Sequence, residues 1–102
     1  MNLVKENREA INSLCEKHKV AKLYAFGSVL TTSFNSESDV DFLVDFKDTE
    51  IQNFATNFFA LKWSLEDLFG REVDLIESEA ISNPYFKEEI EETKKLVYES
   101  RN

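Results

Sequence analysis

Two short groups of residues in this chain could bind a nucleotide phosphate and a metal ion side by side. Gly27 and Ser28 follow an apolar run, and ten residues later come Asp39 and Asp41. A glycine permits a tight turn and lets backbone N–H groups approach an anion, and Ser28 adds a hydroxyl. Asp39 and Asp41 open a second apolar run, and residues two apart on a strand point to the same face. The spacing therefore predicts a phosphate-binding turn that faces two metal-binding carboxylates.

Asp74 supplies a third carboxylate inside a later apolar run. Three neighbouring carboxylates repel one another by about 4 kcal/mol per pair at 4 Å, so they need a cation. Oxygen ligands favour magnesium or manganese over zinc, and two such ions could clamp an in-line phosphoryl transfer. We expect Asp39 and Asp41 to bridge the nucleotide-bound metal, and Asp74 to complete a second metal site and help deprotonate the attacking hydroxyl.

The same residues also have a simpler interpretation. Asp39 and Asp41 could form a polar turn that enters a strand, and Asp74 could be a solvated carboxylate at a strand edge. The pairing of both groups with strand ends favours the metal site over this interpretation.

Hydrophobic spacing predicts the elements that would position these carboxylates. We expect a helix to about residue 19, strands at 20–26, 40–46 and 72–77, a short irregular or helical piece at 29–34, a long helix at 51–69 ended by Gly70, and a final helix from Asn83-Pro84 to about Tyr98. The fold class is thus α/β (α+β), a small mixed three-stranded sheet packed by helices in the order α-β-(short α)-β-α-β-α.

The direction of each strand follows from the motif. Gly27 can meet Asp39 only if the first two strands are antiparallel. The long helical connection then makes the third strand parallel to the second, which brings Asp74 to the same end of the sheet.

Composition limits the domain organisation and the partners. A chain of 102 residues with 42% hydrophobic residues and nine Phe fits a single domain, 1–102. The net charge of −8 argues against a nucleic acid substrate and indicates a small substrate or a basic partner, although an acidic surface can also serve solubility alone. Since neither a signal peptide nor an apolar run long enough for a membrane is present, we expect a cytoplasmic protein.

Three single residues need separate interpretation. Cys15 lies on the apolar stripe of the first helix and is expected to be buried. His18 is expected at the helix end or on the surface, because no second His or Cys supports a zinc site. Trp63 departs from the apolar stripe of the long helix and is a candidate for a partner surface.

The motifs resemble those of the DNA polymerase beta superfamily. The resemblance rests on Gly27-Ser28, the ten-residue gap, Asp39-Val40-Asp41 and the strand Arg71-Glu72-Val73-Asp74-Leu75, and it extends over nearly the whole chain. The length resembles that of its minimal nucleotidyltransferases, called MNT domains, which implies a polymerase beta-like palm fold.

That resemblance implies a specific activity. Such domains are encoded beside HEPN-domain ribonuclease toxins, act as their antitoxins and assemble with them. They transfer AMP from ATP, with magnesium, to a tyrosine hydroxyl of the toxin. By resemblance, Asp39, Asp41 and Asp74 would be the metal and catalytic residues, and Gly27 and Ser28 would bind the nucleotide.

One segment departs from the family pattern. Many relatives carry an Arg and a Gly shortly after the Gly-Ser pair, whereas residues 29–33 contain no cation. Thr31 and Thr32 could donate hydrogen bonds to the phosphates instead. Charge could also come from elsewhere in the chain, and the candidates are Lys22, Lys47 and Arg71.

Three hypotheses follow for the function. The first is an enzyme that adenylylates a protein partner. The second is a binding module that neutralises its partner by occlusion and keeps its carboxylates for nucleotide-dependent assembly. The third, a nucleotidyltransferase for small antibiotic-type molecules, is disfavoured because the chain leaves little room for an acceptor pocket. Three mutually repelling carboxylates favour the first over the second.

Overall fold

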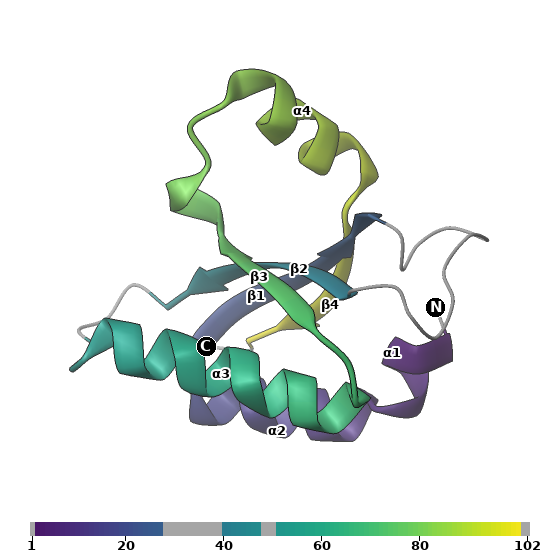
Figure 1. The fold of residues 1–102 in the computed structure, drawn as a ribbon, viewed down its shortest axis with the longest axis vertical. Coiled ribbons are helices and arrows are strands. Elements are labelled where there is room, and N and C mark those ends of the chain that lie inside the picture. Colours follow the sequence, from purple (N-terminus) through teal and green to yellow (C-terminus); the bar gives the residue numbers. More distant parts are fainter. Residues whose placement is uncertain (1, 28–39, 48–50, 101–102) are drawn as a thin grey trace.

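The computed structural model describes residues 2–27, 40–47 and 51–100 (Figure 1). Its elements are α1 (Asn2–Glu6), α2 (Arg8–Lys17), β1 (Val20–Phe26), β2 (Val40–Phe46), α3 (Phe54–Phe69), β3 (Val73–Glu77), the 3-10 helix η2 (Ser78–Ala80), α4 (Pro84–Thr93) and β4 (Lys95–Glu99). Ser28, Asp39 and the short piece expected at 29–34 lie outside the described residues.

The described strands form one mixed sheet in the order β3-β2-β1-β4. β1 is antiparallel to β2 and to β4, and β2 is parallel to β3. The strand directions expected for the first three strands are therefore confirmed, as is the α/β class with a mixed sheet and flanking helices. The sheet has four described strands, however, and the predicted number of three was wrong.

The fourth strand replaces the second half of the predicted last helix. α4 begins where expected, because the Asn83 side chain accepts hydrogen bonds from the backbone N–H groups of Tyr85 and Phe86. It ends at Thr93, and Lys95–Glu99 pairs with β1 instead. Val97 and Tyr98 have the β-branched and aromatic side chains that suit a half-buried strand. The pairing with β1 stabilises the strand conformation of this segment more than its apolar spacing stabilises a helix. The apolar spacing of the last segment would place Tyr85 on the inner face of a helix, but its side chain is 82% exposed.

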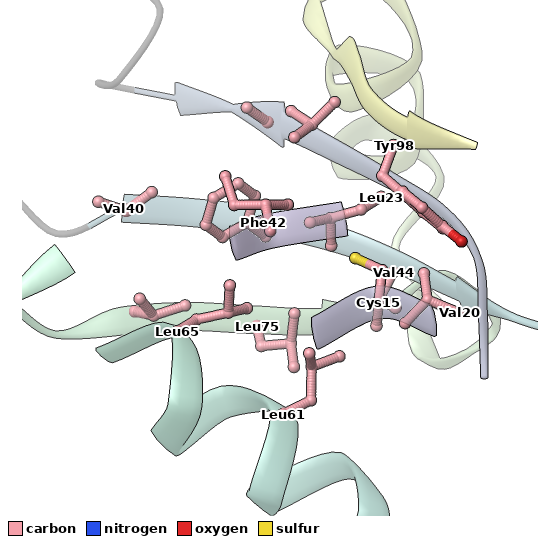
Figure 2. Close-up of a cluster of buried hydrophobic side chains, with 14 of the residues drawn as sticks. Cys15, Val20, Leu23, Val40, Phe42, Val44, Leu61, Leu65, Leu75 and Tyr98 are labelled. Carbon is pink, nitrogen blue, oxygen red and sulfur yellow. The ribbon is translucent and has the colours of Figure 1, made fainter. Parts of the chain in front are cut away.

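One face of the sheet is covered by α2 and α3, which lie together beneath it (Figure 1). Figure 2 shows the core between the sheet and these two helices, where Phe42 and Val44 of β2 pack with Leu61 and Leu65 of α3. Cys15 of α2 is fully buried in this core, as expected, and burial raises the pKa of its thiol to about 12. This thiol therefore stays protonated and acts as a packing group.

The two helices beneath the sheet are held together at His18. The residue lies at the C-terminal end of α2, as expected, but it is only 5% exposed, so the surface alternative was wrong. Its Nδ1 lies 2.8 Å from the carbonyl oxygen of Leu14, and its own carbonyl accepts a hydrogen bond of 2.9 Å from Nδ2 of Asn57 in α3. His18 thus links the end of α2 to α3.

The ends of the other helices differ little from expectation. The first helix is divided at Asn7 into α1 and α2, and α3 begins at Phe54. Asp48 and Thr49, residue types that can cap a helix, precede it and lie outside the described residues. Gly70 ends α3 in the left-handed conformation, with φ of +66°, as predicted for a C-terminal glycine.

Among the described residues, α4 and the short helix η2 lie on the opposite face of the sheet (Figure 1). A small buried cluster of Phe26, Leu43 and Ile90 joins β1, β2 and α4. In the part of the chain that the structure describes, no helix has the length and apolar character needed to cross a membrane.

Candidate functional site

Asp41 and Asp74 lie side by side on adjacent strands. In the parallel pairing of β2 with β3, Asp41 is the register partner of Asp74, and on its other side it is opposite Phe26 of β1. Neighbouring strands are about 4.8 Å apart, and paired residues point to the same face. Because Val40 and Phe42 are fully buried toward α2 and α3, the two carboxylates lie on the face that α4 covers.

Gly27 meets Asp41 at the end of β1. The glycine has φ of +74°, in the left-handed region where a side chain is strained. A Cβ at this position would overlap with Oδ2 of Asp41 and lie 3.2 Å from its Cγ. Glycine is therefore required at position 27 for two reasons: the backbone has a positive φ there, and the Asp41 carboxylate approaches too closely for a side chain.

The structure thus brings three of the five predicted site residues together: Gly27, Asp41 and Asp74. The other two, Ser28 and Asp39, lie outside the described residues. Within residues 2–27, 40–47 and 51–100, no group of three His, Cys, Asp or Glu side chains is placed to hold a metal ion. The expected triad therefore depends on Asp39, and the described part contributes a pair of adjacent carboxylates.

Many relatives carry an arginine after the Gly-Ser pair, and this chain does not. The geometry shows which of the three proposed cationic residues lies close enough to the carboxylates to compensate for it. Lys22 is opposite Asp45, and Lys47 follows the last residue of β2, so both are at the end of the strand distant from Asp41. Asp45 and Lys47 are four and six residues along the strand from Asp41, about 13 and 20 Å, and Lys22 pairs with Glu99 at 3.7 Å instead. Arg71 precedes β3 at the end of the sheet where Asp74 lies. Of the three candidates, Arg71 has the right position.

Glu66 of α3 fixes the strand that carries Asp74, and sequence reasoning missed it. Its Oε2 accepts a hydrogen bond of 3.1 Å from the backbone N–H of Val73 and one of 3.1 Å from Nζ of Lys62. These contacts lower the pKa of the Glu66 carboxyl, with the Val73 hydrogen bond as the larger cause. The only signal in the sequence was the Lys62–Glu66 spacing of four, which predicts a helix surface pair but no contact with a strand.

A cavity of about 580 Å³ lies between the end of β1 and α4. Gly27 and Phe26 form one side of it, and Phe86 and Ile90 of α4 form another. A larger cavity of about 750 Å³ lies near the opposite end of β2, where Lys47 and Tyr98 line it. Of these two cavities, the first is lined by Gly27 and so adjoins Asp41, which Gly27 approaches closely.

Residues 7–97 match the sequence profile of the nucleotidyltransferase domain. The chain belongs to this family. A protein of Methanocaldococcus jannaschii named as a candidate protein adenylyltransferase is 43% identical to it over 85 residues, which cover 83% of this chain and 82% of the relative. A second protein of the same organism and name is 37% identical over 85 residues, with the same coverage. The predicted family and enzyme class, a nucleotidyltransferase, are confirmed.

Solved structures agree with this family. A candidate minimal nucleotidyltransferase is 30% identical, with a TM-score of 0.73 and 89% of each chain covered. A toxin–antitoxin structure with AMP-PNP has a TM-score of 0.72 at 22% identity and covers 93% of this chain and 75% of that one. A complex of a tri-AMPylated Shewanella oneidensis HEPN toxin with an MNT antitoxin has a TM-score of 0.66 at 20% identity, covering 96% of this chain and 74% of that one. The last two show that this nucleotidyltransferase shares the fold of proteins found in such complexes.

Proposed function

We propose that this nucleotidyltransferase transfers AMP from ATP to a hydroxyl, that of a tyrosine, on a HEPN-type toxin, and so acts as its antitoxin. The observation that carries the proposal is the convergence of Gly27, Asp41 and Asp74 at one end of the sheet in a member of this family. The names of the relatives and the HEPN toxin complexes among the structural neighbours support the choice of a protein acceptor.

The residues at this end of the sheet fit a magnesium site. Asp41 and Asp74 offer only carboxylate oxygens, about 4.8 Å apart at the backbone, and two such adjacent charges are stabilised by a cation. Asp39, Asp41 and Asp74 would hold two magnesium ions, which when bound withdraw charge from the phosphates of ATP. The neighbour with AMP-PNP supports ATP as the nucleotide.

The roles of the protein groups in the transfer follow from this arrangement. The Gly27-Ser28 turn binds the outer phosphates through backbone N–H groups and the Ser28 hydroxyl. Asp74 takes the proton of the acceptor hydroxyl, whose oxygen forms a bond to the α-phosphorus. The bond from the α-phosphorus to the bridging oxygen breaks, and pyrophosphate leaves with its electron pair. Asp41 keeps its carboxylate at the reacting phosphate because Gly27 leaves it room.

A second candidate function is neutralisation by binding alone, and one observation favours it. Phe54, Phe59 and Trp63 of α3 are 45%, 45% and 60% exposed, and the rings of Phe59 and Trp63 stack with centroids 5.7 Å apart. An exposed aromatic surface of this kind is typical of protein contacts. It is compatible with a stable complex in which the partner is blocked without any covalent change.

Mass spectrometry of a co-expressed HEPN partner separates the two functions. The partner is produced with wild type, with Asp41→Asn or with Asp67→Asn, which removes the same charge from an exposed position on α3. It is then purified under denaturing conditions, refolded and assayed. We expect added AMP and lasting inactivity with wild type and with Asp67→Asn, because a covalent adduct outlasts the complex. If the partner is unmodified in all three cases and the cells are still protected, neutralisation occurs by occlusion and not by AMP transfer.

A further inference from the structure

The cavity beside Gly27 has an aromatic wall and an apolar floor. Phe26 and Phe86 meet edge to face, with ring centroids 6.3 Å apart and an interplanar angle of 74°. Ile90 is 2% exposed beneath them, whereas Phe86 remains 38% exposed. A space of about 580 Å³ with such walls suits a flat aromatic group, because aromatic rings gain from edge-to-face contact beyond the area they bury.

This cavity adjoins the Asp41 carboxylate through Gly27. Gly27, which lines it, has its α-carbon so close to Asp41 that a Cβ would overlap with the carboxylate. Phe26, which also lines it, is opposite Asp41 in the β1–β2 pairing and therefore lies on the same face of the sheet. A ring packed against Phe26 and Phe86 would have Asp41 on the neighbouring strand and Asp74 on the strand after it.

The charges around the cavity select among aromatic ligands. Glu89 and Glu92 line it together with one cation, Lys95. The exposed surface of α4 adds Glu88, Glu91 and one cation, Lys87, and Glu91 pairs with Lys94 at 2.9 Å. An acidic rim attracts a basic segment and gives no advantage to an aromatic base that is attached to phosphates.

From these observations we propose that the cavity binds the acceptor: the phenol ring of a tyrosine in a basic segment of the partner protein. The ring packs against Phe26 and Phe86, its hydroxyl points toward Asp41 and Asp74, and its flanking Lys or Arg residues contact Glu89 and Glu92. The inference rests on the proposed transfer and adds where this chain holds the acceptor. α4, which covers only this face (Figure 1), becomes the acceptor-binding element.

Peptide binding followed by NMR tests the site directly. The probe is a blocked pentapeptide, Lys-Arg-Tyr-Arg-Lys, and the comparison ligands are Glu-Glu-Tyr-Glu-Glu and adenosine. We expect the basic peptide to shift the amide signals of Phe26, Gly27, Phe86 and Ile90 and to bind at least about tenfold more tightly than the acidic one. Shifts of these amides by adenosine but not by the basic peptide would make the cavity a nucleobase site and overturn the inference.

Two variants of adjacent residues on α4 give a matched comparison. Phe86→Ala removes part of the aromatic wall, whereas Tyr85→Ala removes a side chain that is 82% exposed and does not line the cavity. With the intact partner as substrate, Phe86→Ala should raise KM for the partner about tenfold and leave KM for ATP within about twofold, and Tyr85→Ala should change neither. A raised KM for ATP with an unchanged KM for the partner would contradict the assignment.

Charge reversal supplies an independent check. The double variant Glu89→Lys/Glu92→Lys should bind the acidic pentapeptide more tightly than the basic one, which reverses the wild-type preference. An unchanged preference would show that these carboxylates do not contact the acceptor. Failure of the proposed function has a different signature, since wild type would then leave the intact partner without AMP whatever the peptides do.

Discussion

The two faces of the sheet are built for different purposes although the same strands form both. On the face toward α2 and α3, Val40, Phe42 and Val44 of β2 are fully buried in the main core. On the face toward α4, the buried cluster contains only Phe26, Leu43 and Ile90, and next to it lie a cavity and two carboxylates. Burial on the first face holds the strands in register and leaves the second free to carry charge, which could not be buried without a large cost.

This division means that neighbouring residues on one strand should have opposite effects when mutated. Asp41 and Phe42 are adjacent, but one faces the candidate site and the other the core. Substitutions on the core face should lower stability without a specific effect on transfer, and substitutions of the carboxylates on the α4 face should lower transfer with little effect on stability. The following predictions test that separation.

The largest effect on stability is expected from Phe42→Ala. Phe42 is fully buried and stacks on Phe69 with centroids 5.8 Å apart, so its removal leaves a large cavity in the core. We expect a loss of about 3–5 kcal/mol in the free energy of unfolding, a large part of the stability of a small domain. Urea denaturation measures it, with Leu43→Ala on the opposite face as the control at about 2 kcal/mol. An equal loss in both variants would mean that α4 stabilises its face as much as α2 and α3 do.

Asp41→Asn should strongly reduce AMP transfer and change stability very little. The amide keeps the size of the side chain but not the charge that a metal ion needs, so AMP transfer should fall by about 10²–10⁴-fold. The free energy of unfolding without ligand should change by less than about 1 kcal/mol. Magnesium with ATP should raise the melting temperature of wild type but not of the variant, since a ligand stabilises only the state that binds it. A rise of equal size in both would place the metal away from Asp41.

Gly27→Ala tests the contact between the two halves of the site. The substituted residue would be strained at φ of +74°, at a cost of about 1–2 kcal/mol, and its methyl group would displace the Asp41 carboxylate. We expect a small loss of stability together with transfer reduced about tenfold or more. Gly70→Ala is the matched control, because Gly70 also has positive φ but has open space where a Cβ would be. Comparable transfer in the two variants would show that the position of Asp41 does not depend on Gly27.

Sequence patterns predicted the relative positions of Gly27, Asp41 and Asp74, but they did not predict β4 at the edge of the sheet. Alternation of Val40 and Phe42 with Asp41 fixed the faces of β2, and the antiparallel and parallel strand directions then placed Gly27, Asp41 and Asp74 at one end. The last segment was mistaken because residues 95–99 form a strand only through pairing with β1, which no local spacing reveals. The roles of all five predicted site residues remain predictions, and Ser28 and Asp39 also lie outside the described residues.

Contacts between distant elements were the other part that the sequence could not predict. The burial of His18 depends on Asn57 of α3, thirty-nine residues later in the chain. The contact of Glu66 with the backbone of Val73 likewise depends on how α3 packs beside β3. Both are tertiary hydrogen bonds whose partners are set by packing, and helical spacing carries no information about them.

The smallest effect on stability is expected from a substitution of Glu66, which connects α3 with the strand that carries Asp74. Glu66 lies on the helical side of the sheet, yet its hydrogen bond to Val73 holds the strand position next to Asp74. The pKa of the Glu66 carboxyl is lowered in the folded state by Val73 and Lys62. Its contribution to stability is therefore present above the unfolded pKa, about 4.3, and is lost as pH falls through the lower folded value.

Glu66→Gln should accordingly be slightly less stable than wild type near neutral pH, and the difference should vanish in acid, where wild type is protonated as well. Asp67→Asn, a change of equal charge at the next residue, should show no such pH-dependent difference. Thermal unfolding between neutral and acidic pH measures both, and exchange of the Val73 amide should be faster in Glu66→Gln. If the two variants follow the same pH profile, Glu66 acts only as a surface charge, and the strand of Asp74 must be positioned by the sheet itself.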